Sequence, residues 1–254
     1  MTALPLVAAV VVLTNCFGRA EIDLRGARVR SYVPTDGREV FLQASAPDES
    51  GWVSGGVPVC WPWFYDRGPA DAGLHGSARL SDFRVARRTA DAAVLELEKG
   101  GLALRMSFVL GRRLSVSMTT ENRGVSPAAL TEGLHAYFAV ADLAHASLTG
   151  LDGVRCTTKR RGDVAEQDVC GPRVALAGAN DVCDVKGGVF TLDDPSGGRR
   201  LRIETSGMGQ LAIWNGRTCP PGAACVEPII LREPLALAPG ESHELRLSVE
   251  VLPR

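Results

Sequence analysis

Three short polar segments interrupt apolar, strand-like parts of the sequence, and each carries side chains that can transfer protons or hold an oxygen-rich ligand. They are residues 75–79, 135–138 and 225–228. A histidine in a partly dry site can have a pKa close to neutrality, and a carboxylate is costly to bury without a partner or a task. His135 and Glu227, each in an apolar run, are therefore candidate acid-base groups.

Each of these residues also has a structural interpretation. Taken alone, His135 fits a core histidine bonded to a backbone carbonyl better than it fits a catalytic group. Glu227 can equally form an ion pair with an arginine such as Arg232. The segment that begins at His75 can be a polar surface loop, although its small residues let backbone approach a ligand and Arg79 can bind hydroxyl or phosphate oxygens.

Aromatic side chains supply the flat apolar faces on which sugars pack their C–H groups. The candidates are Trp52, Trp61, Trp63, Phe64 and Trp214. Each of them, taken singly, fits a core position better.

Composition excludes several classes of protein. The formal net charge is -1, with 28 Lys and Arg against 29 Asp and Glu, so no global field gathers nucleic acid or an anionic membrane. A nucleophile elbow, a P-loop, a Gly-rich dinucleotide turn and an HExxH pair are all missing from the sequence. We therefore expect neither a nucleic-acid nor a membrane partner.

The cysteines and the first apolar run indicate the cellular compartment of the protein. Seven cysteines without zinc-type CxxC pairs fit reduced thiols in a cytoplasmic protein. The run at residues 4–13 is too short to span a bilayer and lacks a basic start, so we expect a buried first strand rather than a secretion signal.

Short β-type segments separated by turn signals recur along the chain. Leu114, Val116 and Met118 alternate with polar residues, as a strand with one buried face does. No long stretch has helical periodicity, although weak helical patterns occur at residues 130–135 and 157–167. The pattern predicts an all-β, mostly antiparallel sandwich forming a single domain over residues 1–254.

Several motifs together resemble one family. The run Ser-Gly-Gly-Val-Pro-Val-Cys-Trp-Pro-Trp-Phe at residues 54–64, followed by His-Gly-Ser-Ala-Arg at 75–79, closely resembles the signature of the glucose-6-phosphate 1-epimerase branch of the aldose 1-epimerase superfamily. Leu-His-Ala-Tyr-Phe at 134–138, Ile-Trp-Asn at 213–215 and Cys-Val-Glu-Pro at 225–228 resemble later family motifs, in the same order.

The resemblance implies a galactose-mutarotase-like β-supersandwich that binds a small-molecule sugar or sugar phosphate without a metal or cofactor. By this resemblance Glu227 removes the proton of the anomeric hydroxyl and His135 protonates the ring oxygen. His75, Arg79, Asp181 and Trp214 would bind the substrate, and the protein is expected to be a cytoplasmic monomer. Asp181 matches the family less well, because the aromatic residue that usually follows it is absent.

One departure concerns phosphate. The family normally has an arginine directly before the Gly-Gly-Val-Pro run, where this chain has Ser54, while Arg79 is retained. We therefore expect a mutarotase for a hexose 6-phosphate, glucose 6-phosphate first. The alternatives are a mutarotase for free aldoses or another modified sugar, and a non-catalytic carbohydrate-binding protein on the same fold.

Overall fold

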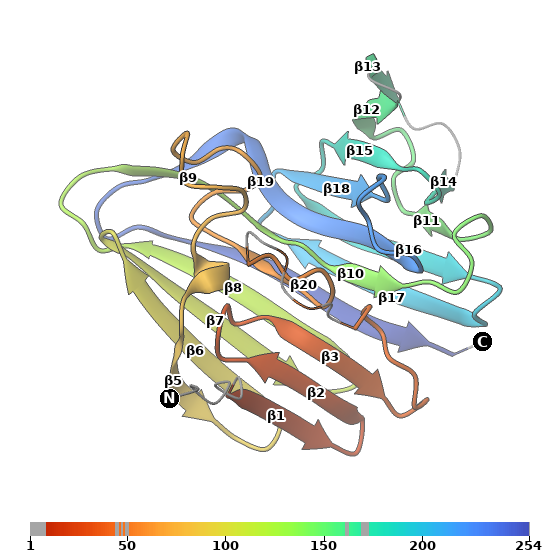
Figure 1. Cartoon of the computed structure of the whole chain (residues 1–254), viewed down its shortest axis with the longest axis horizontal. Helices are drawn as coiled ribbons and strands as arrows, with labels where there is room; N and C mark the ends of the chain where they lie inside the picture. The colour runs from red at the N-terminus through yellow and green to blue at the C-terminus, as the bar shows by residue number, and fades with distance from the viewer. Residues whose placement is uncertain are drawn as a thin grey trace, which may run out of the picture.

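The computed structural model describes residues 9–43, 46, 48, 51–160, 163–168 and 173–253. Within these ranges the regular structure is β-strand, apart from one turn of 3-10 helix, η1 (Ala78–Leu80). Every strand pair in its three sheets is antiparallel (Figure 1). The expected all-β, antiparallel class is confirmed.

The strands divide into sheets of three, eight and nine. The small sheet consists of β1 (Val10–Asn15), β2 (Gly18–Asp23) and β3 (Val29–Pro34). The eight-stranded sheet contains β4 (Val59–Cys60), β9 (Ala128–Leu134), β10 (Tyr137–Ala139), β12 (Arg155–Arg160), β13 (Asp163–Asp168), β15 (Asn180–Cys183), β18 (Gln210–Trp214) and β19 (Ala223–Leu237). The nine-stranded sheet contains β5 (Arg84–Arg88), β6 (Ala92–Lys99), β7 (Leu102–Leu110), β8 (Leu114–Asn122), β11 (Ser147–Thr149), β14 (Val174–Ala175), β16 (Gly187–Asp194), β17 (Arg199–Ser206) and β20 (Ser242–Leu252).

The core lies between the sheets. Along β8 the side chains of Leu114, Val116 and Met118 are buried and their neighbours are not, as the alternating pattern predicts. Apolar side chains from all three sheets form one continuous buried cluster. The eight-stranded sheet therefore has one face toward this cluster and a second face on which a site can be built.

The helical interpretation of two weak sequence patterns is wrong. Residues 130–135 lie mainly in β9, and, of residues 157–167, those that the structure describes lie in β12 and β13. Sheet pairing decides both, because β9 is held between β19 and β4, and β12 between β13 and β15. Propensity over so few residues is weak compared with a ladder of backbone hydrogen bonds.

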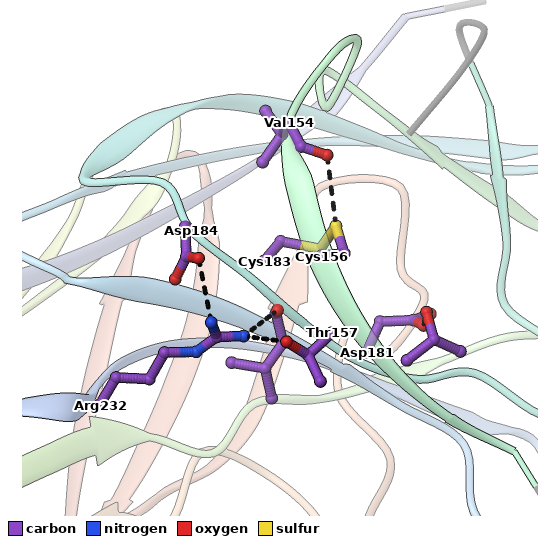
Figure 2. The surroundings of a disulfide bond; sticks show 9 residues. Val154, Cys156, Thr157, Asp181, Cys183, Asp184 and Arg232 are labelled. Atoms are coloured by element: carbon purple, nitrogen blue, oxygen red, sulfur yellow. Dashed lines mark hydrogen bonds and ion pairs between the residues drawn. A yellow bond between two sulfur atoms is a disulfide. The ribbon is translucent and has the colours of Figure 1, made fainter. Parts of the chain in front are cut away.

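A disulfide joins β12 to β15 and corrects the expectation that the cysteines are all reduced. Cys156 and Cys183 are directly opposite in the antiparallel register and are bonded through their sulfur atoms (Figure 2). They are 27 residues apart in the chain, so no local spacing signals the bond. The described cysteines other than this pair are free thiols.

The first apolar run lies partly outside the described residues. Its described end belongs to β1, which pairs with β2 and buries Val11 and Leu13, as expected of a buried first strand. None of the described residues forms a helix with the length and apolar character that a bilayer crossing requires.

Candidate active site

His135 lies at the break between β9 and β10, which both pair with β19 in the eight-stranded sheet. Its backbone N–H donates to the carbonyl of Pro58 at 3.0 Å, which fixes the chain where neither strand continues. The residue is only 6% exposed. The apolar run around this histidine thus places it in a dry site, as the sequence indicates.

Glu227 reaches the same place from the adjacent strand, β19. The register pairs Tyr137 with Cys225, so Glu227, two residues further along β19, comes opposite the break that holds His135. Pro228, which has no N–H for a ladder, comes opposite Leu134, the last residue of β9, next to this break. The carboxylate is 2% exposed.

The two side chains meet without a direct hydrogen bond. His135 Nε2 and Glu227 Oε2 are 3.6 Å apart. Neither His135 Nδ1 nor Glu227 Oε2 has a hydrogen-bond partner among the described residues, although both atoms are buried. Such unsatisfied groups are expensive unless a ligand completes them.

Burial moves the two pKa values in opposite directions. Desolvation raises the pKa of Glu227 well above its usual range, and the charge of Cys219 adds to the effect. Desolvation, and secondarily the charge of His75, lowers the pKa of His135 well below its usual range. Both shifts favour the uncharged forms, a protonated carboxyl group on Glu227 and a neutral ring on His135.

His75 stands at the edge of this pair, in a conformation that few side chains adopt. Its φ is 61°, in the left-handed region, and its ring centre is 5.3 Å from that of His135. The backbone N–H of Tyr65 donates to His75 Nδ1 at 3.3 Å, which leaves the ring proton on Nε2. Burial lowers the pKa of His75 to about 4, so the ring is a neutral hydrogen-bond donor.

The residue after His75 has to be a glycine. Gly76 has a φ of +72°, and a Cβ there would lie 2.1 Å from the carbonyl oxygen of Trp61, with which it forms a β-bridge. This contact holds the 75–79 segment against β4 and begins the turn into η1. The small residues of that motif therefore position His75.

Aromatic rings surround the two histidines. Trp52 stacks on His75 at 4.8 Å and meets His135 edge-on at 5.5 Å, while Tyr137 stacks on His135 at 4.6 Å. Phe64 contacts both histidines. Flat apolar walls beside hydrogen-bonding groups are the usual composition of a sugar site.

Trp214 and Arg79, both expected to bind substrate, also lie at this cluster. The Trp214 ring is 6.0 Å from that of His135. The Arg79 guanidinium lies 5.6 Å from the Trp52 ring centre, in cation–π geometry, and its Nε donates to the carbonyl of Leu74. The Ser54 hydroxyl hydrogen-bonds to Tyr137, on the same side of the site as Trp52.

Asp181 is not brought to the site. Across the strands it pairs with Ile213, and Ile213 pairs with Val226, so all three point into the core, whereas Glu227 shares its face with Ala212. The carboxylate is 5% exposed and accepts a hydrogen bond from Thr158 Oγ1 at 2.5 Å. In this structure Asp181 is a buried structural residue near the Cys156–Cys183 disulfide (Figure 2).

A separate hollow of about 250 Å³ lies on the nine-stranded sheet. Its charged lining includes Arg105 and Glu96, which are paired with each other, and Arg123, which is paired with Glu98. Exposed ion pairs of this kind do not place a general acid beside a general base in a dry site. The histidine cluster remains the better candidate for chemistry.

One buried group near the site has no clear signal in the sequence. Glu132, fully buried on β9, accepts hydrogen bonds from Thr120 Oγ1 at 2.7 Å and from His243 Nδ1 at 2.9 Å. Thr120 in turn accepts a hydrogen bond from the indole of Trp61. His243 and Glu132 are 111 residues apart in the chain, so no local spacing signals this pair.

The chain is similar to several known proteins. A curated protein of Salmonella typhimurium named "Putative glucose-6-phosphate 1-epimerase" is 33% identical over 147 residues, which are 52% of this chain and 49% of that protein. The chain thus spans about half the length of this curated relative.

Solved structures show the same fold. A "putative mutarotase" of Salmonella typhimurium superposes with a TM-score of 0.85 at 21% identity, over 96% of this chain and 90% of that one. A "galactose mutarotase related enzyme" of Lactobacillus acidophilus has a TM-score of 0.82 at 15% identity, over 96% and 98%. The galactose-mutarotase-like supersandwich is confirmed.

The family profile described as aldose 1-epimerase matches residues 9–250, which include every motif of the histidine cluster. This chain belongs to the aldose 1-epimerase family.

Proposed function

We propose that the protein is a mutarotase that interconverts the α and β anomers of a hexose 6-phosphate by acid-base ring opening. The observation that carries the proposal is the buried pair of His135 and Glu227, 3.6 Å apart and each with an unsatisfied polar atom. The two oxygens that exchange protons in a hemiacetal are bonded to one carbon. An acid and a base that act on them together must therefore be close neighbours.

In the proposed reaction Glu227 takes the proton of the anomeric hydroxyl while His135 gives a proton to the ring oxygen. The bond from the anomeric carbon to the ring oxygen breaks, and the anomeric carbon becomes an aldehyde. After rotation about the neighbouring carbon–carbon bond, the hydroxyl attacks the other face of the aldehyde. His135 takes back its proton from that hydroxyl, and Glu227 returns its proton to the carbonyl oxygen. His75 Nε2–H would hold the ring oxygen, and Trp52, Trp214 and Tyr137 would pack against the sugar.

Phosphate recognition in this proposal depends on Arg79. Its guanidinium lies beside His75 and over the Trp52 ring. Of the two positions where the family has an arginine, this chain keeps Arg79 and has Ser54 at the other. The relative from Salmonella typhimurium is named for glucose 6-phosphate, which supports the same substrate. Charge-assisted hydrogen bonds from an arginine fork suit a phosphate dianion.

Ser54 favours the alternative, a mutarotase for free aldoses. Where the family has a second arginine, this serine hydrogen-bonds to Tyr137 and supplies no charge. The third possibility, a binding protein without activity, does not explain a matched acid and base in a dry site.

The test is NMR exchange between the α and β anomers of glucose 6-phosphate, glucose and galactose, with and without the protein. We expect faster exchange for all three sugars, fastest for the phosphate ester. Exchange at the uncatalysed rate for every sugar would overturn the proposal. Activity that disappears with a chelator and returns with a divalent ion would contradict the acid-base mechanism.

The substrate choice is tested by specificity constants for glucose 6-phosphate and glucose in Arg79→Ala and Ser54→Arg. We expect Arg79→Ala to lose about tenfold or more for the phosphate ester and little for glucose, because one charge-assisted contact is removed. The exposed Arg84→Ala is the control. If wild type shows no preference for the phosphate ester and Ser54→Arg creates one, the free-sugar alternative replaces this substrate.

A further inference from the structure

A third potential metal ligand lies beside the acid-base pair. Cys225 and Glu227 are two residues apart on β19, so both side chains point to the face that holds His135. One ligand atom from each of His135, Cys225 and Glu227 lies within 4.8 Å of the other two. All three residues are at least nine-tenths buried.

We propose that His135, Cys225 and Glu227 form an inhibitory binding site for Zn²⁺, in which the metal occupies the position of the sugar's anomeric centre. Nitrogen, sulfur and oxygen from three side chains, with a fourth position open, form a donor set typical of tetrahedral zinc. Mg²⁺ and Ca²⁺ prefer six or more oxygen ligands and do not suit it.

The separation of the donors supports a tetrahedral ion. With zinc–nitrogen and zinc–oxygen bonds of about 2.0–2.2 Å, the edge of a tetrahedron is about 3.4 Å. His135 Nε2 and Glu227 Oε2 are 3.6 Å apart, so a change of a few tenths of an ångström is enough. The sulfur has to move by about 1 Å at most, which a single rotation of the Cys225 side chain can supply.

The carboxylate oxygen of the pair lacks another partner that would compete with a metal. Glu227 Oε2 is buried and makes no hydrogen bond among the described residues. On binding, the thiol and the carboxyl group release their protons to solvent, and the zinc dication neutralises the thiolate and carboxylate that remain. Binding is therefore accompanied by proton release and weakens as the pH falls.

The predicted inhibition rests on the proposed function, whereas metal binding does not. Because the metal and the sugar use the same side chains, they exclude each other, so Zn²⁺ should raise the apparent KM and leave kcat at saturating sugar unchanged. Cys225 takes no part in the proposed ring opening. Its thiol serves the metal alone.

The experiment uses untagged protein without added thiol and titrates it with Co²⁺ as a spectroscopic substitute for Zn²⁺. We expect a thiolate-to-cobalt charge-transfer band in the near ultraviolet, which added Zn²⁺ abolishes. Cys225→Ser should lose the band, and Cys16→Ser, which removes an exposed thiol in the β1–β2 turn, should keep it. Glu227→Gln should keep the band and bind at least about tenfold more weakly.

A measurement on wild type covers the case in which Cys225→Ser does not fold. X-ray absorption of the Zn²⁺-loaded protein should show one sulfur neighbour at about 2.3 Å together with nitrogen or oxygen neighbours. No charge-transfer band in wild type, a band unchanged in folded Cys225→Ser, or a zinc shell without sulfur would each overturn the proposal.

Anomer exchange supplies a separate readout. Zn²⁺ should inhibit wild type, and Cys225→Ser should need at least about tenfold more Zn²⁺ for the same inhibition, while Mg²⁺ has no effect on either. If the protein does not catalyse anomer exchange at all, the proposed function fails and the cobalt spectrum still decides the metal site.

Discussion

At the scale of single residues, the acid and the base are best described as one group that holds one proton. Burial disfavours a charge on either side chain, raising the pKa of Glu227 and lowering that of His135. In the proposed reaction Glu227 is ionised and His135 is protonated while the sugar ring is closed. Both side chains are uncharged while the sugar is an open aldehyde. Each half of the reaction converts one state into the other, and the number of protons on the pair stays constant.

The pH dependence of activity follows from this shared proton. Adding a second proton requires His135 to be charged, and its lowered pKa places this acid limb below the usual histidine range. Removing the shared proton requires Glu227 to be charged, and its raised pKa moves that alkaline limb upward. We expect kcat/KM for anomer exchange at pH 6 to remain within about twofold of its value at pH 7. A steep loss between pH 7 and pH 6, with a midpoint at the ordinary histidine pKa, would show that the two groups titrate independently.

Removing either partner should abolish turnover without unfolding the protein. Glu227→Gln and His135→Asn are each expected to lower kcat by roughly a hundredfold or more, the usual range for a lost acid-base group. The measurement is anomer exchange by NMR, with circular dichroism to verify the fold. His145→Asn is a matched control, because His145 is an exposed residue paired with Asp142. Near-normal turnover in either variant removes that residue from the mechanism.

At the scale of strands, the alternating segments were predictable and the strands without alternation were not. The alternation of Leu114, Val116 and Met118 falls within β8, which has one buried and one exposed face. The turn between β2 and β3, where Gly26 has a φ of 81°, follows from no such alternation. β19 carries Glu227 and Pro228 and is buried on both faces over its first eight residues, so it shows no period of two.

The residues of the candidate site likewise include some that are predictable from the sequence and some that are not. Glu227 and His135 are conspicuous because they are polar residues in apolar runs, and the structure brings them together. Asp181 could be placed only from the register of β15 against β18, which turns its side chain into the core. The partner of Cys156 likewise depends on the pairing of two strands that are distant in the sequence. The type of each side chain is known from the sequence, whereas the sheet face on which it lies depends on pairing between strands that are distant in the sequence.

The disulfide should contribute measurably to the stability of the β12–β15 region. It closes a loop with a sequence separation of 27, for which the loss of chain entropy in the unfolded state corresponds to about 3.5 kcal/mol. We expect the Cys156→Ser, Cys183→Ser double variant to lose about that free energy of unfolding in urea, with Cys16→Ser as the control. Equal stability of wild type with and without reductant would argue that this bond does not stabilise the fold.

At the scale of the whole molecule, a buried chain of hydrogen bonds joins the two large sheets. It runs from Trp61, beyond β4, through Thr120 on β8 to Glu132 on β9, and ends at His243 on β20. Trp61 also holds Gly76 through its bridge, so the same chain supports the segment that carries His75. Buried polar groups that are fully paired favour one arrangement of the sheets over others.

This chain of hydrogen bonds makes the free energy of unfolding depend on pH through His243. The hydrogen bond that His243 donates to Glu132 raises the pKa of His243 above its unfolded value, against the opposing effect of burial. The stabilisation is therefore fully present below the unfolded pKa of about 6.5 and is lost as the pH rises through the higher folded pKa. We expect the difference in unfolding free energy between wild type and His243→Gln to be largest near pH 5.5 and to shrink at alkaline pH. A difference that is constant with pH, or grows as the pH rises, would contradict this linkage.

The alternation of side chains at the start of β19 constrains how such a chain can change over evolutionary time. Val226 points into the core and Glu227 toward His135, and each is set by its partner on β18. Inserting one residue ahead of them would exchange the two, burying a carboxylate among apolar side chains and presenting a valine to His135. We therefore expect gains and losses of residues to be tolerated in turns such as the one between β16 and β17, or at the bulge between Ile230 and Leu235, and not within the part of β19 that carries Glu227.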